Sequence, residues 1–434
     1  MWFFSGTLQA NEPPARLIRM RHSAVLYRPG GPGSRQKPLP SRQHRNRGST
    51  VKVVCAAIGL AAVLGLCACA PAKSPVGAAV TFTAGPTAGA ASPHSSRAAS
   101  TGASAPVASP GASPAAAPVT ITAVGDTMLG NTPDLPPDPA TYFDAVKHIL
   151  DPGAQIVFGN LEGTLTTAPT SKCSPRDTRE GNCFAFRDPP GYVRYLKQAG
   201  FTILNDANNH SYDFGAAGQA QTVRVIHAAG LAQTGLPGEI TLVTANGIKF
   251  AFLAFAPYAY DANLLDLPAA RALIKQAGRE ADVVVVYMHA GAEGSDADHV
   301  TGQEEYYLGE DRGNAEAFAH MAIDSGASLV IASGPHVLRG LQFYKHHLIA
   351  YSLGNFASYG DFSTEGDLDM SVILRVTLTS AGRFKRARLY PIQFTGQGQP
   401  VPGGGGVAFA SRLSAEDFGA SAARILPSGV IKAP

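Results

Sequence analysis

Short apolar runs along this chain end abruptly in clusters of polar residues. Five runs share this pattern: VTITAVGDTML reaches Asp126, AQIVFGNLEG reaches Asn160 and Glu162, GFTILNDANNH reaches Asn209 and His210, DVVVVYMHAG reaches His289, and SLVIASGPHV reaches His336. Each run has the β-branched content and the length of a buried strand. Ligands of α/β sheets collect beyond the carboxyl ends of such strands, where several loops converge. We therefore expect these polar side chains to form one shared site.

The remaining apolar pattern predicts alternating helices and strands from residue 118 onward. Apolar faces at helical spacing predict helices at 139–150, 189–199, 218–229, 269–279 and 315–324, and a closing helix near 415–426. Further strands are expected at 240–243, 249–255, 347–351, 370–378 and 386–394. Alternating strands and helices followed by more continuous strand predict an α/β fold with layered, mixed sheets.

The first 70 residues have the composition of a leader and a signal segment. Residues 1–50 are rich in arginine, and we interpret them as a disordered basic leader or as the product of a wrongly assigned start. Residues 51–70 are apolar and end in small residues, which predicts a secretory signal. The segment LCAC resembles a bacterial lipobox, which makes Cys69 the expected lipidated residue. An uncleaved anchor helix is the alternative, because about 18 apolar residues are close to the shortest membrane span.

Residues 71–117 consist almost entirely of Ala, Pro, Ser, Gly and Thr. Such a segment cannot bury enough apolar surface to offset its conformational entropy, so we expect a disordered linker. The predicted globular domain then occupies residues 118–400. Residues 401–434 are predicted to form a C-terminal tail that carries the closing helix.

The distribution of charge argues against a nucleic-acid partner. The formal net charge is +3, but residues 1–52 hold ten Lys and Arg against one acid, which leaves 25 basic and 31 acidic residues in the rest. An acidic excess is the opposite of the basic surface that nucleic-acid binding requires. Three arginines, Arg187, Arg312 and Arg339, would suit the carboxylates of an anionic polymer if they gathered at the site. We interpret them instead as scattered surface charges.

The five cysteines divide between the signal segment and the domain. Three lie in the signal, and Cys173 and Cys183 remain in a polar insertion. In an oxidising extracytoplasmic space these two are expected to close a small disulfide loop. Two unpaired thiols are the alternative, and nothing in the spacing indicates a cysteine metal site.

Each polar cluster, taken alone, has a structural explanation. Asp126 could cap a turn or a helix, and Asn160 could do the same. Single histidines such as His289 and His336 are more often structural than catalytic. Asp213 follows His210 by three residues, a spacing at which a carboxylate can orient an imidazole. Because carboxylate, amide and imidazole groups occur together at five strand ends, the set as a whole indicates a divalent-metal site.

The motifs GDTML, GNLEG, NNHSYDFG, HAGAE, GPHVLRG and YSLGNF resemble, in order and spacing, those of the CapA family, which is linked to poly-γ-glutamate capsule synthesis. The resemblance covers the chain from Val119 to Phe356. It implies a four-layer α/β/β/α sandwich of the calcineurin-like metallophosphoesterase type with a two-metal centre. The metal ligands that it implies are Asp126, Glu162 or Asn160, Asn209, His289 and His336. It also implies that His210 is the general acid.

Two parts of the sequence depart from the family pattern. Met128 stands where phosphoesterases of the wider group have a histidine, and Ser333 and Gly334 stand where CapA proteins commonly have at least one. The expected cofactor is therefore one or two divalent ions, Mn, Zn, Fe or Mg, and a metal-free site is the alternative.

Three functions are consistent with these sequence features. The first is a metal-dependent hydrolase or transferase at the cell surface. The second is a non-catalytic accessory protein that binds or anchors a capsule polymer. The third is a degenerate metallophosphoesterase fold that serves as an interaction module. The expected partners are the membrane, through the N-terminal anchor, an anionic polymer such as poly-γ-glutamate, and capsule synthesis proteins. The expected location is extracytoplasmic, as a membrane-anchored lipoprotein.

Overall fold

The computed structural model describes residues 117–434. The predicted basic leader, the signal segment with Cys69 and the linker up to residue 116 lie outside the described residues. Within 117–434, none of the helices has the length and apolar character that crossing a membrane requires.

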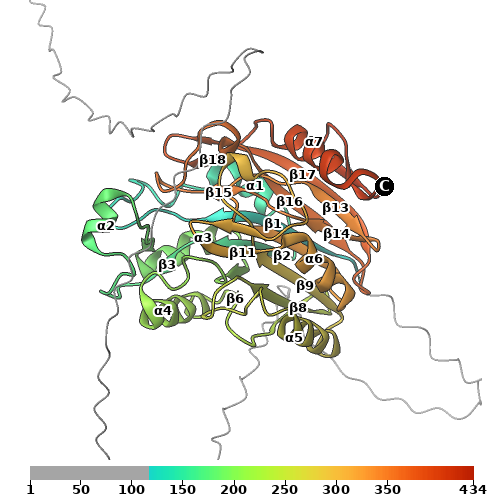
Figure 1. Ribbon diagram of the computed structural model, residues 1–434, viewed down its shortest axis with the longest axis horizontal. Helices are drawn as coiled ribbons and strands as arrows, with labels where there is room; N and C mark the ends of the chain where they lie inside the picture. Colours follow the sequence, from blue (N-terminus) through green and yellow to red (C-terminus); the bar gives the residue numbers. More distant parts are fainter. Residues whose placement is uncertain (1–116) are drawn as a thin grey trace, which may run out of the picture. The chain divides into compact units, whose positions relative to one another are not determined.

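Two β-sheets lie face to face at the centre of the fold (Figure 1). The larger sheet has the strand order β19-β20-β17-β16-β1-β2-β5-β6, with β15 beside β1 and β18 beside β17. Its strands are β1 (Val119–Thr127), β2 (Ile156–Leu161), β5 (Ile203–Asn205), β6 (Ala232–Thr234), β15 (Asn355–Ala357), β16 (Ser371–Leu378), β17 (Phe384–Thr395), β18 (Gln399–Pro402), β19 (Arg424–Ile425) and β20 (Val430–Lys432).

The smaller sheet has the order β13-β14-β12-β9-β8-β7. Its strands are β7 (Thr241–Ala245), β8 (Ile248–Phe255), β9 (Val283–His289), β12 (Leu329–Ser333), β13 (Leu341–Tyr344) and β14 (His347–Ala350). Two short pairs lie outside both sheets: β3 (Thr164–Leu165) with β4 (Arg187–Asp188), and β10 (Glu305–Tyr307) with β11 (Glu310–Gly313).

Helices cover the outer face of each sheet. The helices are α1 (Asp144–Leu150), α2 (Pro175–Glu180), α3 (Val193–Ala199), α4 (Gly215–Ala228), α5 (Leu267–Glu280), α6 (Ala315–Asp324) and α7 (Gly406–Phe418). Apolar residues of α1, α3 and α4 pack on the larger sheet, and those of α5 and α6 pack on the smaller one. The layer order is therefore helix, sheet, sheet, helix, and the predicted four-layer α/β/β/α sandwich is confirmed.

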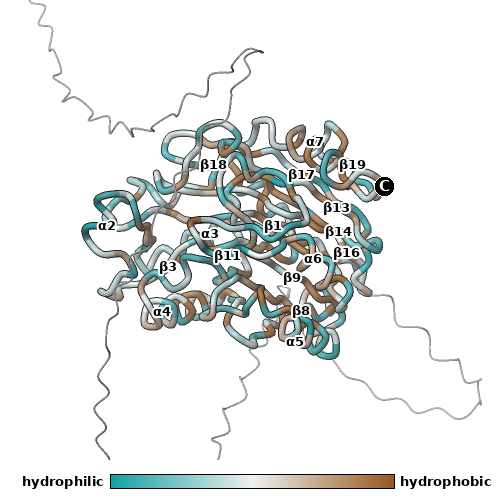
Figure 2. Tube along the Cα trace, in the orientation of Figure 1, coloured by the Kyte–Doolittle hydropathy of each residue, from teal (hydrophilic) through white to brown (hydrophobic). Residues whose placement is uncertain are grey.

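Strand β9 shows why the sequence folds into these layers. All of its residues are buried, and neighbouring side chains point to opposite faces of the strand. Val283 and Val285 join the core between the two sheets, whereas Val284 and Val286 join the core under α5 and α6. The hydropathy along the chain follows this division, with hydrophobic residues in the central strands and hydrophilic ones in exposed elements such as α2 (Figure 2).

The C-terminal residues differ from the prediction. The closing helix expected near 415–426 is wrong, because α7 spans Gly406–Phe418 and is followed by β19 and β20. The run PGGGG at 402–406 has no apolar pattern, and its last glycine is the first residue of this helix. Residues 401–434 also contribute to the sandwich itself, since β20 pairs with β17 and α7 packs on the core between the sheets. The helix predicted at 139–150 is shorter than expected and starts at Asp144.

The parallel strands of both sheets deliver their carboxyl ends to one region. In the larger sheet β1, β2, β5 and β6 run parallel, and in the smaller sheet β8, β9, β12 and β14 do. A bulge at the end of β1 aims Asp126 into this region. Gly125 is required there, because a Cβ at this position would lie 1.9 Å from the carbonyl oxygen of Gly354.

Candidate metal centre

Asp126, Glu162 and His289 meet between the two sheets. Each side chain is fully buried, and one potential ligand atom from each lies within 4.8 Å of the other two. Asp126 and Glu162 come from the ends of β1 and β2 in the larger sheet, whereas His289 ends β9 in the smaller sheet. The imidazole Nε2 of His289 lies 3.5 Å from Glu162 Oε1. The pairing therefore crosses the interface between the sheets.

Three atoms of this cluster are buried without a hydrogen-bond partner. They are Asp126 Oδ2, Glu162 Oε1 and His289 Nε2. A buried polar atom without a partner costs about 1–3 kcal/mol, and a charged one costs more. Two carboxylates and one imidazole are a donor set that borderline and hard divalent ions accept. The residues present therefore fit a divalent metal ion, which would satisfy all three atoms at once.

The amide of Asn160 holds the two carboxylates in place. Its Nδ2 donates to Asp126 Oδ1 at 2.7 Å and also donates to Glu162. Its Oδ1 accepts from the side-chain amides of Asn205 at 2.6 Å and Asn208 at 3.0 Å. Because the oxygen of Asn160 already has two donors, the geometry favours Glu162 over Asn160 as the metal ligand at this strand end.

The imidazole of His336 lies close to the carboxylate of Asp126. Its Nδ1 lies 3.2 Å from Asp126 Oδ2 and 2.8 Å from Asn355 Oδ1, and its Nε2 lies 3.8 Å from Glu293 Oε2. The backbone of His336 has a φ of 59°, which is rare for a residue with a side chain. Such outliers cluster at functional sites, and this one turns the imidazole towards the carboxylate.

Burial and neighbouring charges shift the pKa values of these groups in opposite directions. Burial raises the pKa of Glu162 well above its usual range, and the nearby charge of Asp126 raises it further. Burial lowers the pKa of His289 to about 3. For Asp126, burial alone would raise the pKa, but the ion pair with His336 holds it below the usual value. Without a cation the site therefore disfavours two adjacent carboxylate charges.

His210 and Asp213 form a hydrogen-bonded pair at the edge of this cluster. His210 Nδ1 lies 2.8 Å from Asp213 Oδ2, and Asp213 also forms an ion pair with Lys172 at 2.6 Å. The backbone N–H of Phe186 donates to the same carboxylate at 2.6 Å. Burial lowers the pKa of His210, and the charge of Asp213 opposes this shift. The ring is thus fixed through Nδ1, which leaves its Nε2 for other partners.

Asn209 is less deeply buried than the trio. Its side chain is half-buried, and its Oδ1 is buried without a hydrogen-bond partner. Its backbone carbonyl accepts from Lys172 Nζ at 3.1 Å. The unpaired oxygen leaves Asn209 available as a ligand.

The disulfide loop lies next to the pair formed by His210 and Asp213. Cys173 and Cys183 are joined with an S–S distance of 2.02 Å. Lys172, which contacts Asp213, immediately precedes the first cysteine. The loop therefore fixes the start of the insertion against the carboxylate that orients His210.

The positions that depart from the family pattern have other roles. Met128 is buried, and its side chain packs near Gly163. The hydroxyl of Ser333 donates to Asp126 and lies 2.5 Å from the hydroxyl of Tyr287. A Cβ on Gly334 would lie 3.2 Å from His289 Nε2, at a φ of 118°. Ser333 therefore occupies the space beside Asp126 with a hydrogen-bond donor rather than with an imidazole.

The interpretation of the arginines as scattered surface charges is wrong for two of the three. Arg339 is fully buried and donates both Nη atoms to Glu305, at 2.8 and 2.6 Å. Arg312 is 4% exposed and donates to Glu293 at 2.8 Å. Arg187 donates to the carbonyl of Ala168 and lies over the ring of Phe214. Arg312 is thus linked to the site through Glu293. Arg339 supports the site indirectly, through its contacts with Glu305.

Several contributors to the site were not predicted from the sequence. They are Lys172, Asn205, Tyr287 and Asn355. Tyr287 could have been predicted, because it precedes His289 by two residues on the same strand and the two side chains must lie on the same face of that strand. Lys172 could not have been predicted, because its contact with Asp213 depends on how the insertion folds back.

A family model described as "Bacterial capsule synthesis protein PGA_cap" matches residues 120–359. The capsule biosynthesis protein CapA of Bacillus anthracis is 33% identical over 186 residues, which cover 38% of this chain and 42% of that protein. The PGA biosynthesis protein CapA of Bacillus subtilis (strain 168) is 27% identical over 253 residues, which cover 54% of this chain and 61% of that protein. The chain thus spans 42% and 61% of the lengths of these two relatives.

Among solved structures, a putative 5'-nucleotidase from Staphylococcus aureus is 12% identical, with a TM-score of 0.37 over 66% of this chain and 54% of that one. A purple acid phosphatase from yellow lupin is 11% identical, with a TM-score of 0.32 over 64% and 52% of the two chains. The family match covers more than half of the chain and includes Asp126, Glu162, His289 and His336. The chain therefore belongs to the bacterial capsule synthesis protein family.

Proposed function

We propose that this protein is a metal-dependent hydrolase or transferase that acts on an anionic capsule polymer of the poly-γ-glutamate type. The observation that carries the proposal is the buried trio of Asp126, Glu162 and His289, each with an unpaired atom directed at the same small volume. The names of the two Bacillus relatives, a capsule biosynthesis protein and a PGA biosynthesis protein, support the assignment to capsule synthesis.

Asp126, Glu162 and His289 would hold the first metal ion, and His336 and Asn209 are the further candidate ligands. A bound divalent ion would polarise a phosphoryl or carbonyl oxygen of the substrate and lower the pKa of a bound water. The trio supports one ion directly. Because Met128 and Ser333 take the places of imidazoles, a second ion in the described residues would depend on His336 and Asn209.

The proposed role of His210 is to hold or move a proton at Nε2. Its Nδ1 is engaged by Asp213 at 2.8 Å, which fixes the orientation of the ring. Phe186 packs against one side of the ring, with centroids 4.3 Å apart. A proton carrier that is fixed in this way contributes about 10²–10⁴-fold to rate in enzymes of known mechanism.

Arg312 is proposed to position the anionic groups of the substrate. Its Nε and Nη1 atoms are buried without partners, while Nη2 contacts Glu293. The guanidinium lies 5.9 Å from the ring centroid of Tyr258 and 5.6 Å from that of Tyr307. Glu293 also approaches His336, so a single side chain separates Arg312 from the metal site. A guanidinium with two unused donors suits carboxylate or phosphate oxygens.

Elemental analysis combined with hydrolase assays tests the proposal. We expect the purified wild-type protein to bind Mn²⁺ or Zn²⁺ and to cleave a phosphodiester substrate or a γ-glutamyl polymer. His289→Ala should lose the metal, and its activity should fall at least about 100-fold, because removal of a ligand exceeds the usual effect of its outer partners. His227→Ala, on the surface of α4, is the matched control and should retain both metal and activity.

A non-catalytic polymer-binding protein is the second candidate, and the missing imidazoles at Met128 and Ser333 favour it. Under this alternative the wild-type protein and His289→Ala would both lack metal and activity. Deletion of the protein would then release polymer from cells while polymer synthesis continued. That pair of results would contradict the hydrolase proposal.

The Asp213→Asn variant separates proton transfer from metal binding. The amide keeps the shape of Asp213 but cannot hold the His210 ring and Lys172 with the same charge. We expect kcat to fall about 10- to 100-fold, with KM and metal content nearly unchanged. Asp177→Asn, in the exposed helix α2, should have no effect. A parallel loss of metal in Asp213→Asn would instead indicate that Asp213 supports the ligands.

We further propose that the protein acts outside the cytoplasm, anchored through a lipid on Cys69, with the membrane and other capsule synthesis proteins as partners. The lipobox-like segment LCAC supports this location. Metabolic labelling with a palmitate analogue would test it, because Cys69→Ala should lose the label and leave the membrane fraction.

A further inference from the structure

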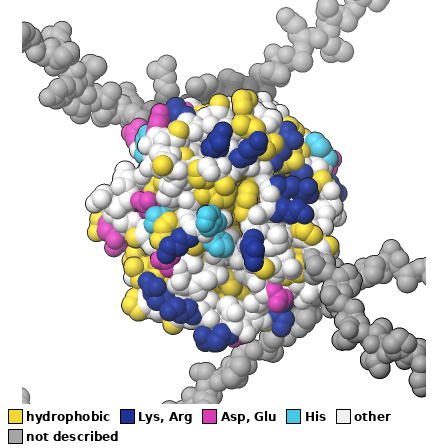
Figure 3. All heavy atoms as spheres, turned by 90° about the vertical axis from the view of Figure 1, so that its right-hand side faces the viewer, with side chains coloured by type: hydrophobic (Ala, Val, Ile, Leu, Met, Phe, Trp, Pro, Cys, Tyr) yellow, Lys and Arg dark blue, Asp and Glu magenta, His cyan; other side chains and the backbone are white. Residues whose placement is uncertain are grey.

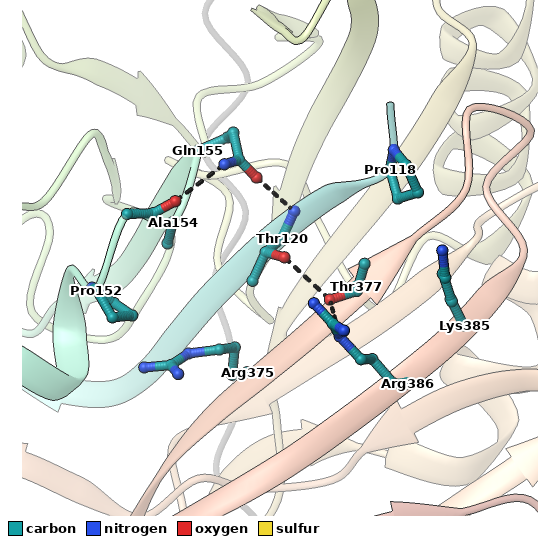
Figure 4. A pocket seen from close by; sticks show the side chains of 10 residues that line it. Pro118, Thr120, Pro152, Ala154, Gln155, Arg375, Thr377, Lys385 and Arg386 are labelled. Atoms are coloured by element: carbon teal, nitrogen blue, oxygen red, sulfur yellow. Dashed lines mark hydrogen bonds between the residues drawn. The ribbon is translucent and has the colours of Figure 1, made fainter. Parts of the chain in front are cut away.

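A basic pocket lies at the opposite end of β1 from the metal centre. The cavity measures about 440 Å³, and its lining includes three cations but no carboxylate. The residues that line it are Pro118, Thr120, Pro152, Gly153, Ala154, Gln155, Arg375, Thr377, Lys385 and Arg386. Figure 4 shows Arg375, Arg386 and Lys385 spread along β16 and β17, beside the start of β1. Thr120 and Asp126 are six residues apart in one strand, or roughly 20 Å.

The three cations of this pocket have no counter-charge. Among residues 117–434, no carboxylate oxygen lies within 4.0 Å of the charged nitrogens of Arg375, Lys385 or Arg386. The sequence contains no acidic residue from 370 to 415. Residues 118–434 as a whole hold 23 Lys and Arg against 31 Asp and Glu, so this region is a local exception to an acidic domain. The end of the sandwich that carries the start of β1 shows more Lys and Arg than Asp and Glu side chains (Figure 3).

The fold holds these charges together despite their repulsion. Arg375 stands directly opposite Arg388 in the antiparallel pair of β16 and β17, and like charges at such positions are destabilising. Arg375 donates to the hydroxyl of Tyr390 at 2.7 Å and to the carbonyl of Ile149 at 2.5 Å, and both partners are neutral. Its Nε is buried and has no partner. The side chain is therefore fixed, while its charge remains uncompensated.

The donors around the pocket match a phosphate group. Arg375 and Arg386 present guanidinium groups, Lys385 presents a point charge, and Thr120 and Thr377 present hydroxyls 2.9 Å apart. Arg386 Nε donates to the Thr377 hydroxyl at 3.3 Å, which brings that guanidinium to the hydroxyl pair. A phosphate dianion offers three acceptor oxygens and up to two charges, whereas a carboxylate offers two oxygens and one charge.

We propose that this pocket is a second anion site, which binds the phosphate group of a ligand independently of the metal centre. Two sources supply this chemistry, a soluble phosphate ester and a phospholipid headgroup. Pro118 lines the pocket and is among the first described residues.

Binding measurements on the full-length chain test the site. The background is His289→Ala in the presence of a chelator, so that no phosphate is held at the metal centre. One arm uses inorganic phosphate and glycerol 3-phosphate in equilibrium dialysis, and the other uses phosphatidylcholine vesicles with and without phosphatidic acid. We expect saturable binding that Lys385→Gln/Arg386→Gln weakens at least about tenfold, because two charge-assisted contacts are removed. Both residues are exposed, so the variant should unfold at the same temperature as its parent.

Arg383→Gln/Arg424→Gln is the matched control, because it removes the same charge from exposed residues that do not line the pocket. It should bind the probes as its parent does. Binding in the dialysis arm would identify a soluble ester as the source, and binding to vesicles alone would identify a headgroup. An absence of binding in both arms would overturn the proposal, and so would an equal loss in the control, which would indicate diffuse attraction by charge.

Discussion

Asp126→Asn is expected to abolish metal binding and to lower kcat/KM at least about 10³-fold. A metal ion contributes several kcal/mol of charge stabilisation in the transition state, and 1.36 kcal/mol corresponds to a factor of ten. Asp126 is central because it contacts Asn160 of β2, Ser333 at the end of β12 and His336 in the loop that follows β12. The amide keeps an acceptor oxygen for Asn160 and Ser333 but removes the charge that attracts the cation.

Thermal unfolding with and without added metal distinguishes this effect from misfolding. The wild-type protein should gain about 2.7 kcal/mol at a metal concentration of 100 times Kd, and Asp126→Asn should gain nothing. Without metal, the variant should be nearly as stable as the wild type, because the repulsion between Asp126 and Glu162 is relieved while the ion pair with His336 is lost. Asp144→Asn, an exposed residue of α1, is the control and should respond to metal as the wild type does. Metal-dependent stabilisation of Asp126→Asn would contradict the assignment of Asp126 as a ligand.

Arg339→Ala is expected to destabilise the protein by about 3–5 kcal/mol, which is typical of breaking a buried ion pair from one side. Arg339 is fully buried and binds Glu305 through two nitrogens, while its Nε donates to the carbonyl of Ala297 at 2.7 Å. Glu305 also accepts from the backbone N–H of Ala292, in the loop that follows His289. The substitution would therefore leave a carboxylate without its partner beside the loop that supports the metal site.

Urea unfolding measures this loss. Arg339→Lys should recover only part of the stability, because an ammonium cannot form the two parallel hydrogen bonds of a guanidinium. Arg412→Ala, which removes a half-exposed side chain and its ion pairs with Glu416 and Asp298, is the control and should cost less than about 1 kcal/mol. A loss below about 1 kcal/mol in Arg339→Ala would show that solvent or another residue compensates Glu305.

The local order of the fold was predictable because it depends on neighbouring residues. Burial in a strand follows a period of two and in a helix a period near 3.6, so β9 and α6 were located from their apolar residues. The C-terminal residues were harder to predict. The glycine run before α7 has no apolar pattern, and β19 and β20 are too short to show one. The pairing of β20 with β17 also spans a large separation in sequence.

The side chains at the ends of the parallel strands could be identified from the sequence alone, since a strand and the polar residues that follow it are adjacent in the chain. Which of these side chains touch one another depends on the tertiary structure. Glu162 meets His289, and Ser333 meets Asp126, across the interface between two sheets. The orientation of the Asn160 amide likewise depends on Asn205 and Asn208. These contacts depend on how the two sheets pack, which is set by the whole core between them rather than by any local pattern.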